Sequence, residues 1–319
     1  MATSDALLRA GTPDAATAPS AGPWRHAWRR FVRHRMALVS LVVLAIVVVL
    51  AVGTATIPAL ERYAPTDQHL EEHQVHAGPS GEFWLGTDNL GRDLWARTWD
   101  GVRISLKVAI ASQVIVLGIG LGVGLAAGLG GRWTDSAMMR LTDLTYAFPD
   151  LLAIILLRSV LLDRPWPVIG TGDPQIPGLP GPLLQVTLAI GLVAWATMAR
   201  LIRGQMLQLR SREYILAADA MGASRFRVVT RHMLPNAMGP VIVAVTVGIP
   251  LAIFAEAVLG FIGFGLPSPN ASLGTLVNDG YIYFRQNTWM LLVPAAAIAI
   301  LTLCFTFIGD GLRDAMDPR

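Results

Sequence analysis

Long apolar runs separated by short polar segments dominate the sequence. A helix of about 20 apolar residues crosses a bilayer, and six runs reach that length. They cover residues 36–60, 104–129, 137–160, 183–203, 237–257 and 286–309. The pattern therefore predicts an all-α, polytopic membrane protein with six transmembrane helices.

The polar segments divide the chain into five parts. Residues 1–23 are mainly Ala, Thr, Ser, Pro and Gly, which is typical of a disordered tail. After this tail we expect an interfacial helix and first span (24–60), an extracytoplasmic loop domain (61–102), a five-helix core (103–311) containing a cytoplasmic loop (204–236), and a cytoplasmic tail (312–319).

Charge predicts the orientation of these parts. The chain has 53% hydrophobic and only 15% charged residues, too apolar for an ordinary soluble domain. Arginines dominate residues 24–35 and 200–231, whereas acidic residues outnumber basic ones in 61–103. By the positive-inside rule both basic segments lie in the cytoplasm. We therefore expect a multi-pass protein of the cytoplasmic (inner) membrane with both termini cytoplasmic.

Arginines alternate with aromatic residues in 24–35. A nucleic-acid surface has this composition, but the segment runs directly into an apolar span, so a helix at the membrane interface is favoured. The basic leader and the apolar run are both too long for a cleaved signal peptide. The single cysteine, Cys304, excludes an intrachain disulfide.

The second apolar run is rich in glycine. A phosphate-binding loop would require Gly-Lys-Ser/Thr after the glycines, and the run lacks it. Glycines four residues apart instead allow two membrane helices to approach closely. We expect helix packing here, and neither an ATP site nor a bound cofactor in this chain. The glycines are Gly118, Gly120, Gly122, Gly124 and Gly128.

Three histidines, His69, His73 and His76, have a spacing that would place them on one helical face as metal ligands. No pattern indicates that this stretch is helical, and solvated loop histidines are the favoured interpretation, with no metal site.

Elsewhere, Pro149, Asp150 and Glu256 lie in or beside apolar spans. Pro149 should kink a helix. Asp150 should face a water-filled path or cap a helix end, and Glu256 should line a path or meet a partner subunit.

The polar segment 212–236 separates two apolar runs and is long for a loop between spans. Good helix formers precede Gly222, which stands where a helix would end. Ser224 can cap a second helix that Pro235 would close. Two short helices joined by a glycine turn would form a projection that fits a groove on another protein. An amphipathic helix lying on anionic lipid is the alternative.

The spacing in this segment resembles the EAA loop of bacterial ABC importer permeases. Ala217-Ala218 is followed by Gly222 and then by Leu234-Pro235. In that family the loop docks into a cleft on a cytoplasmic ATPase. The pattern differs from the family at Leu216, Asp219 and His232. The resemblance implies ATPase coupling through Ala217, Ala218, Asp219, Gly222, Ala223, Ser224, Leu234 and Pro235.

A second motif, GTDxxGRDxxxR, precedes the second apolar run. It consists of Gly86, Thr87, Asp88, Gly91, Arg92, Asp93 and Arg97. The motif resembles the corresponding segment of the C-type permease of dipeptide and oligopeptide importers. The C-terminal GDGLRDAMDPR is similar as well, so the resemblance extends from about residue 30 to the end.

This resemblance implies a type I ABC importer permease fold and a transport subunit that is not itself an enzyme. It implies a homologous B-type permease, two ATP-binding subunits holding ATP and Mg, and an extracytoplasmic substrate-binding protein as partners, with membrane lipid around them and no nucleic acid. The expected substrates are di- or oligopeptides. Nickel importers share this permease type and are the alternative. An ion-coupled secondary transporter, which tends to have repeated halves, and a membrane-anchored scaffold fit less well.

Overall fold

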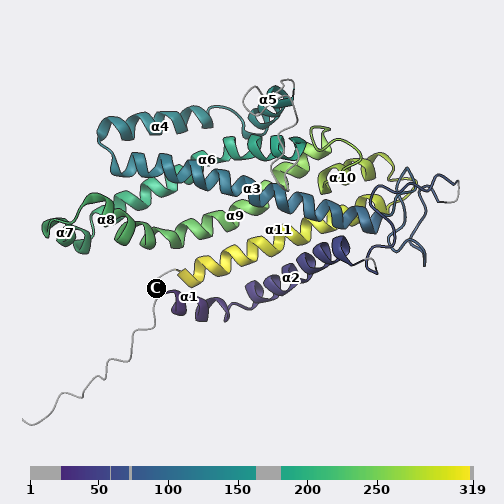
Figure 1. Ribbon diagram of the computed structural model, residues 1–319, viewed down its shortest axis with the longest axis horizontal. Coiled ribbons are helices and arrows are strands. Elements are labelled where there is room, and N and C mark those ends of the chain that lie inside the picture. Colours follow the sequence, from purple (N-terminus) through teal and green to yellow (C-terminus); the bar gives the residue numbers. More distant parts are fainter. Residues whose placement is uncertain (1–22, 58, 72–73, 163–180, 317–319) are drawn as a thin grey trace, which may run out of the picture.

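The computed structural model describes residues 23–57, 59–71, 74–162 and 181–316, which form an elongated helical bundle (Figure 1). No β-strand occurs in this described part, as the apolar pattern predicts. Its elements are α1 (Pro23–Phe31), α2 (Arg35–Thr56), α3 (Leu94–Leu129), α4 (Arg132–Tyr146), α5 (Asp150–Leu162), α6 (Gly181–Arg210), α7 (Glu213–Ala220), α8 (Arg225–Val228), the π-helical segment η2 (Val229–Met233), α9 (Leu234–Phe261), α10 (Leu273–Ile282) and α11 (Trp289–Met316).

Five helical stretches are long and apolar enough to cross a membrane: α2, α3, α6, the run Arg225–Phe261 and α11. Their bounds differ from those predicted. The helix α3 begins ten residues before 104, inside the expected outer loop domain, because Asp93 caps it and accepts a hydrogen bond from the Trp95 N–H at 3.1 Å. The helix α6 continues to Arg210, so it takes up the start of the expected loop 204–236.

The third predicted span is not one helix. The helix α4 ends at Tyr146, and α5 begins at Asp150 after a three-residue break. Proline lacks an N–H and disfavours helical geometry in the residue before it, so Pro149 ends the helical path and does not kink a continuous helix. The Pro149 carbonyl then accepts from the Ala153 N–H at 2.9 Å, which starts α5. Neither α4 nor α5 is long enough to count among the five spans.

The close pairing of α3 with α6 forms the centre of the bundle (Figure 1). A Cβ atom added at Gly120, Gly124 or Gly128 would lie 2.6–2.7 Å from the nearest atom of α6, so these positions must be glycine for the helices to touch. Gly118 and Gly122 have open space at the same position. The packing role predicted for the glycines four residues apart is therefore confirmed for one face of α3.

Helix α9 does not begin as the sequence predicts. Pro235 was expected to close the second short helix of the polar loop, but α8, η2 and α9 follow one another without a break. Pro235 is the second residue of α9, and the helical path passes through it. The π-helical turn immediately before it takes up the change in helical register. The projection thus consists of one short helix, α7, and a second helix that continues into the membrane span.

The two ends of the bundle carry different elements (Figure 1). Helices α7 and α1 and the last turn of α11 lie towards one end, and the segment 61–93 with α10 lies towards the other. Phe31 of α1 is buried in a cluster with Ile308 and Ala315 of α11. His34 lies 3.7 Å from Asp314. The basic N-terminal segment and the polar loop therefore share one end, as the charge pattern requires.

Candidate functional site

The turn between α7 and α8 has the geometry expected of Gly222. Its φ is +80°, a left-handed conformation that favours glycine. The Gly222 N–H donates to the Asp219 carbonyl at 2.9 Å, and the Ala223 N–H donates to the Ala218 carbonyl at 3.1 Å. These two bonds form a Schellman motif, which ends α7 and reverses the chain sharply. Ser224 occupies the N-cap position of α8, but its side chain makes no capping hydrogen bond, contrary to its predicted role.

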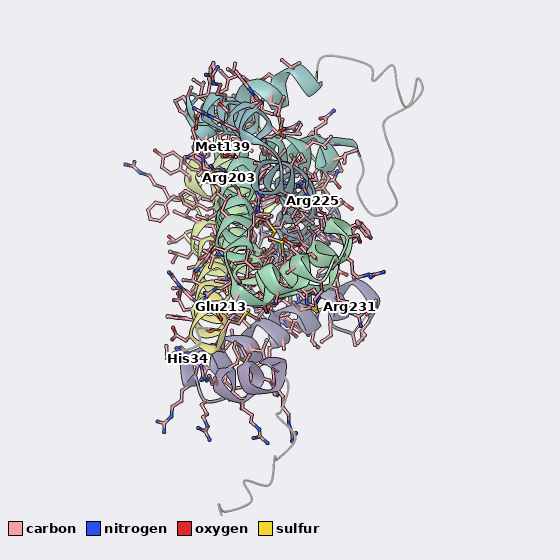
Figure 2. All side chains as sticks on the ribbon, turned by 90° about the vertical axis from the view of Figure 1, so that its left-hand side faces the viewer. His34, Met139, Arg203, Glu213, Arg225 and Arg231 are labelled. Atoms are coloured by element: carbon pink, nitrogen blue, oxygen red, sulfur yellow. The ribbon has the colours of Figure 1, made fainter. Side chains whose placement is uncertain are left out.

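The surface of this turn is apolar as well as basic. We define the α7 tip as residues 213–227. Leu216, Met221 and Phe226 are 57%, 82% and 80% exposed, so the turn presents three large apolar side chains at its surface. Glu213 begins α7 and Arg225 begins α8, and both are labelled in the view onto this end of the molecule (Figure 2). Sequence reasoning named Leu216 only as a departure from the family motif and gave none of the three side chains a role at the surface.

The two alanines of the motif have different surroundings. Ala217 is exposed, whereas Ala218 is 7% exposed and packs against the chain itself. Ala218 joins a buried cluster that includes Ile215, Val228 and Met233, together with residues of α6 and α9. The small size of Ala218 thus serves the attachment of α7 to the bundle. Leu234 is half-buried, and Pro235 is exposed at the start of α9.

Two arginines of α6, Arg200 and Arg203, form ion pairs with acidic residues of α4. Arg203 forms a two-bonded ion pair with Asp135, through Nε to Oδ1 and through Nη2 to Oδ2, the latter at 2.7 Å. Hydrogen bonding from Arg203 holds the pKa of Asp135 below its ordinary value. Arg200 pairs with Asp143 at 2.6 Å and stacks over the Tyr146 ring at 4.1 Å. Sequence analysis counted both arginines only as topology signals, and the structure gives them partners.

A cavity of about 470 Å³ lies between α3, α4, α5, α6 and α9. Asp150 is the only charged residue among the described residues that line it. The exposed Asp150 also begins α5, where a carboxylate interacts favourably with the helix dipole. Both predicted roles of Asp150, facing an open path and occupying a helix start, are thus compatible with its position. Gln113, Tyr146 and Thr197 supply further polar groups at the cavity wall.

Glu256 is not in this cavity. It is 1% exposed and lies inside the chain, where its Oε2 accepts a hydrogen bond from the Ser105 hydroxyl at 2.7 Å. The same hydroxyl accepts from the Leu273 N–H at 3.3 Å, at the start of α10. Glu256 therefore links α9 to α3 and α10. In this structure Glu256 faces neither the cavity nor the protein surface, so its predicted place on a translocation path or against a partner subunit stays a prediction.

An arginine absent from the sequence-based candidates holds the irregular segment after α9. Arg158 lies in α5, inside the third predicted span, and is 2% exposed. Its Nε and Nη2 each donate at 2.8 Å to the carbonyls of Phe264 and Gly265, and its Nη1 donates to Gln185 at 2.9 Å. Non-helical backbone at membrane depth needs such internal partners. The Pro/Gly-rich residues that follow α5 lie outside the described residues.

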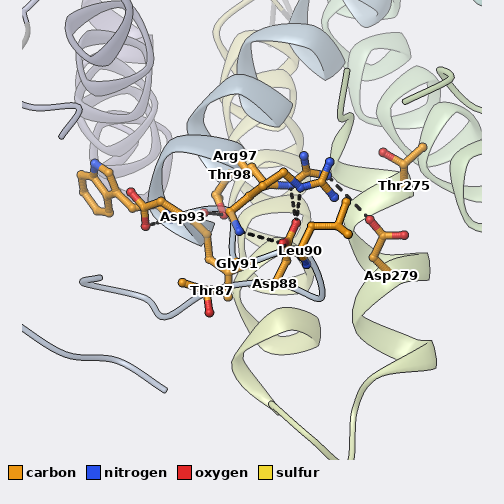
Figure 3. A network of polar contacts seen from close by, with 12 residues as sticks. Thr87, Asp88, Leu90, Gly91, Asp93, Arg97, Thr98, Thr275 and Asp279 are labelled. Atoms are coloured by element: carbon orange, nitrogen blue, oxygen red, sulfur yellow. Dashed lines mark hydrogen bonds and ion pairs between the residues drawn. The ribbon is translucent and has the colours of Figure 1, made fainter. Parts of the chain in front are cut away.

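The GTDxxGRDxxxR motif forms a buried ion network (Figure 3). Asp88 is 1% exposed and accepts from Arg92 Nε at 2.7 Å, and Arg97 Nε lies 3.2 Å from the same carboxylate. Arg97 Nη2 lies 3.7 Å from Asp279 of α10. The network ties the segment before α3 to α10, so the motif has a structural role that its turn-rich composition alone does not reveal.

Backbone geometry and caps explain the rest of this motif. Gly86 and Gly91 have φ values of +84° and +68°. A Cβ on Gly91 would lie only 1.8 Å from the His69 carbonyl oxygen, so only glycine fits there. The Thr87 hydroxyl accepts from the Ala77 N–H at 2.8 Å. Burial raises the pKa of Asp93, while hydrogen bonds from the start of α3 lower it.

The histidines do not form a metal site in the part of the chain that the structure describes. The His69 ring packs against Tyr63 and Phe83, and the His76 ring lies against Tyr283. His73 lies outside the described residues. Across the described residues, no group of three His, Cys, Asp or Glu side chains could hold a metal ion. His69 is half-buried, so it is a packed residue and not the solvated loop histidine that was expected.

Apolar spanning helices, a projecting α7 tip and a broken segment between α9 and α10 together define a polytopic permease-like bundle. Two crystal forms of the inward-facing MetNI methionine ABC transporter share this fold. Their TM-scores are 0.51 and 0.54, with 21% and 19% sequence identity, and each comparison covers 68% of this chain and 94% of that chain. The fold class is thus that of type I ABC importer permeases.

The chain belongs to the family described as binding-protein-dependent transport system inner membrane component, which matches residues 118–319. Residues 22–79 match the N-terminal TM domain of oligopeptide transport permease C. The chain is 37% identical to the oligopeptide transport system permease protein OppC of Bacillus subtilis, over 98% of this chain and 95% of that protein. It is 38% identical to the dipeptide transport system permease protein DppC of the same organism, over 96% and 89%. These relatives confirm the resemblance drawn from the GTDxxGRDxxxR motif.

Proposed function

We propose that this chain is the transmembrane permease subunit of an ATP-driven importer that moves di- or oligopeptides across the cytoplasmic membrane. The observation that carries the proposal is the α7 tip. It exposes large apolar side chains beside arginines, and it is continuous through α8 and η2 with the spanning helix α9. A displacement of the α7 tip by a docked partner is thus transmitted through α8 and η2 to the spanning helix α9. The near full-length relatives named for oligopeptide and dipeptide transport support the substrate class.

The complete importer contains further chains in this proposal. One of two ATP-binding subunits docks on the α7 tip, and Ala217, Asp219 and Gly222 lie within that contact. The ATP-binding subunits hold the ATP and Mg. A homologous B-type permease pairs with this chain to form a heterodimer, and an extracytoplasmic substrate-binding protein delivers the peptide. The shared end of α1, α7 and α11 supports a cytoplasmic location for both termini. Asp150, at the wall of the cavity, faces the translocation path.

The alternatives weighed from sequence receive less support. The nickel importer depended on a histidine cluster, and His69 and His76 instead pack against separate aromatic rings. An ion-coupled secondary transporter conflicts with membership of the binding-protein-dependent family.

Reconstitution tests the proposal. The four types of subunit are incorporated into liposomes with ATP inside and a labelled peptide outside. We expect uptake only when the binding protein and ATP are both present, with no uptake driven by an ion gradient alone. Uptake that persists without ATP would refute the proposal, and ATP-dependent uptake of nickel but not of peptides would reinstate the alternative.

A further inference from the structure

Helix α1 carries a basic surface at the end of the bundle that it shares with α7 and the last turn of α11 (Figure 1). Side chains ending in nitrogen extend away from the bundle on the purple segment around His34 (Figure 2). Residues 15–60 contain no acidic residue, and the nearby Asp314 of α11 lies 3.7 Å from His34. Four exposed arginines form no ion pair or side-chain hydrogen bond within the described residues: Arg25, Arg29, Arg33 and Arg35. We define the α1 surface as these four arginines and Trp28, and the function proposed above assigns no partner to it.

One side of α1 is fixed to the bundle. Phe31 is 4% exposed and lies in a cluster with Ile308 and Ala315 of α11. The Trp28 ring stacks on the Phe31 ring at a centroid distance of 5.9 Å, yet Trp28 remains 61% exposed. Tryptophan is enriched at the level of the lipid headgroups in membrane proteins. The α1 surface is therefore held in one place, and its exposed aromatic side chain is typical of a membrane interface.

The next helix, α2, carries an exposed apolar stripe that ends at the α1 surface. Residues three and four positions apart share one side of a helix. Arg35, the first residue of α2, lies four positions before Val39 and so continues the side to which the stripe belongs. The buried Ala37 and Ser40 lie on the other side of α2. We define the α2 stripe as the exposed residues Val39, Val42, Ile46 and Val49.

This juxtaposition indicates what kind of ligand fits. A lipid whose acyl chains cover the α2 stripe has its headgroup where the apolar run ends, beside Arg35. Guanidinium groups bind phosphate oxygens with paired N–H donors. A zwitterionic headgroup carries its own compensating cation, whereas an anionic headgroup does not, so basic residues attract anionic lipids selectively. A soluble polyanion would satisfy the arginines but would leave the stripe uncovered.

We propose that the α1 surface and the α2 stripe together bind an anionic phospholipid of the adjacent leaflet, with the acyl chains on the stripe and the phosphate on the arginines. This site goes beyond an interfacial position for α1, because it distinguishes lipids by the net charge of their headgroups. It also places the bound lipid beside the attachment of α1 to α11.

Native mass spectrometry of the delipidated full-length chain in detergent tests the proposal. Palmitoyl-oleoyl phosphatidylglycerol, palmitoyl-oleoyl phosphatidylcholine and sodium phosphate are titrated separately. We expect phosphatidylglycerol to bind about tenfold more tightly than phosphatidylcholine or free phosphate, because more than one arginine contributes. The double variant Arg29→Gln with Arg35→Gln removes one arginine from each helix and should abolish this preference. It breaks no side-chain contact of the described chain, and Arg25, Arg30 and Arg33 maintain the positive-inside signal.

The matched control is the double variant Arg132→Gln with Arg140→Gln. It makes the same change in charge at exposed positions of α4 and should keep the wild-type preference. Three results would each overturn the proposal: equal wild-type affinity for phosphatidylglycerol and either other ligand, a preference that survives Arg29→Gln with Arg35→Gln, or equal losses in the two double variants. No transported solute enters the titration, so its outcome is independent of the proposed function.

Discussion

Arg158 illustrates how single residues maintain irregular structure inside an apolar bundle. Its guanidinium spans α5 and the segment after α9, and it satisfies two carbonyls that no helix pairs. Sequence analysis assigned Arg158 no role, because its partners Phe264 and Gly265 are distant from it in the sequence. By contrast, Gly222 was predictable, since few residues other than glycine adopt a left-handed turn at a helix end.

Replacing Arg158 with Met tests this residue-scale account. The substitution leaves the carbonyls of Phe264 and Gly265 without their donors, and we expect a loss on the order of 3 kcal/mol in the free energy of unfolding. The measurement is the thermal unfolding midpoint of the purified protein in detergent. Arg140→Met is the matched control, because Arg140 is exposed and should give a wild-type midpoint. Equal midpoints for the two variants would contradict the role of Arg158.

At the scale of elements, the pairing of α3 with α6 depends on one stripe of glycines. Gly124 has the carbonyl of Ala199 and the side chain of Ile202 within 2.7 Å of an added Cβ, whereas Gly122, two residues away, has nothing within 4 Å. The four-residue spacing was visible in the sequence. The sequence did not show which set of glycines faces α6, because Gly118 and Gly122 have the same four-residue spacing as Gly120, Gly124 and Gly128.

Gly124, which contacts α6, and Gly122, which has open space around it, give a matched pair of variants. Gly124→Val should force α3 and α6 apart, and we expect reduced yield of folded protein and early elution or aggregation in size-exclusion chromatography. Gly122→Val should elute like the wild type. Similar behaviour of both variants would show that α3 and α6 do not pack through this stripe.

The ends of elements were the least predictable features. Three element boundaries were set by features that the apolar pattern does not contain. They are the Asp93 cap that starts α3 early, the break at Pro149, and the continuation of the helix through Pro235. A run of apolar residues predicts that a helix exists. Caps and proline positions decide where the helix begins and ends.

At the scale of the whole molecule, the distribution of charge predicted which parts share an end of the bundle. The segment 61–93 and α10 lie opposite α7, α1 and the end of α11 (Figure 1). The ion network around Asp88 and the cluster around Ala218 could not be foreseen, since each joins segments that are distant in the sequence.

Orientation across the membrane is testable with single cysteines. Gly81→Cys lies in the exposed segment before α3, and Met221→Cys lies at the α7 tip, where the side chain is 82% exposed. In intact cells we expect an impermeant maleimide to label position 81 and not position 221. The native Cys304 is buried and should not react in either variant. The reverse labelling pattern would overturn the orientation inferred from charge.

The central claim is that the α7 tip couples ATP hydrolysis in partner subunits to transport, and Gly222→Val tests it most directly. Its added Cβ meets nothing within 4 Å in this chain, so the expected defect arises from the φ of +80°, which a β-branched residue adopts only at a cost, and from contact with the docked partner. Gly131→Val is the control, because its φ is −79° and its surroundings are equally open.

The measurement is peptide uptake together with co-purification of the ATPase subunits, at matched membrane expression of the two variants and the wild type. The account predicts that Gly222→Val inserts normally, yet loses at least tenfold in uptake and retains less ATPase, a change of about 1.4 kcal/mol or more in coupling, while Gly131→Val matches the wild type. Full uptake and full ATPase retention in Gly222→Val would contradict the account.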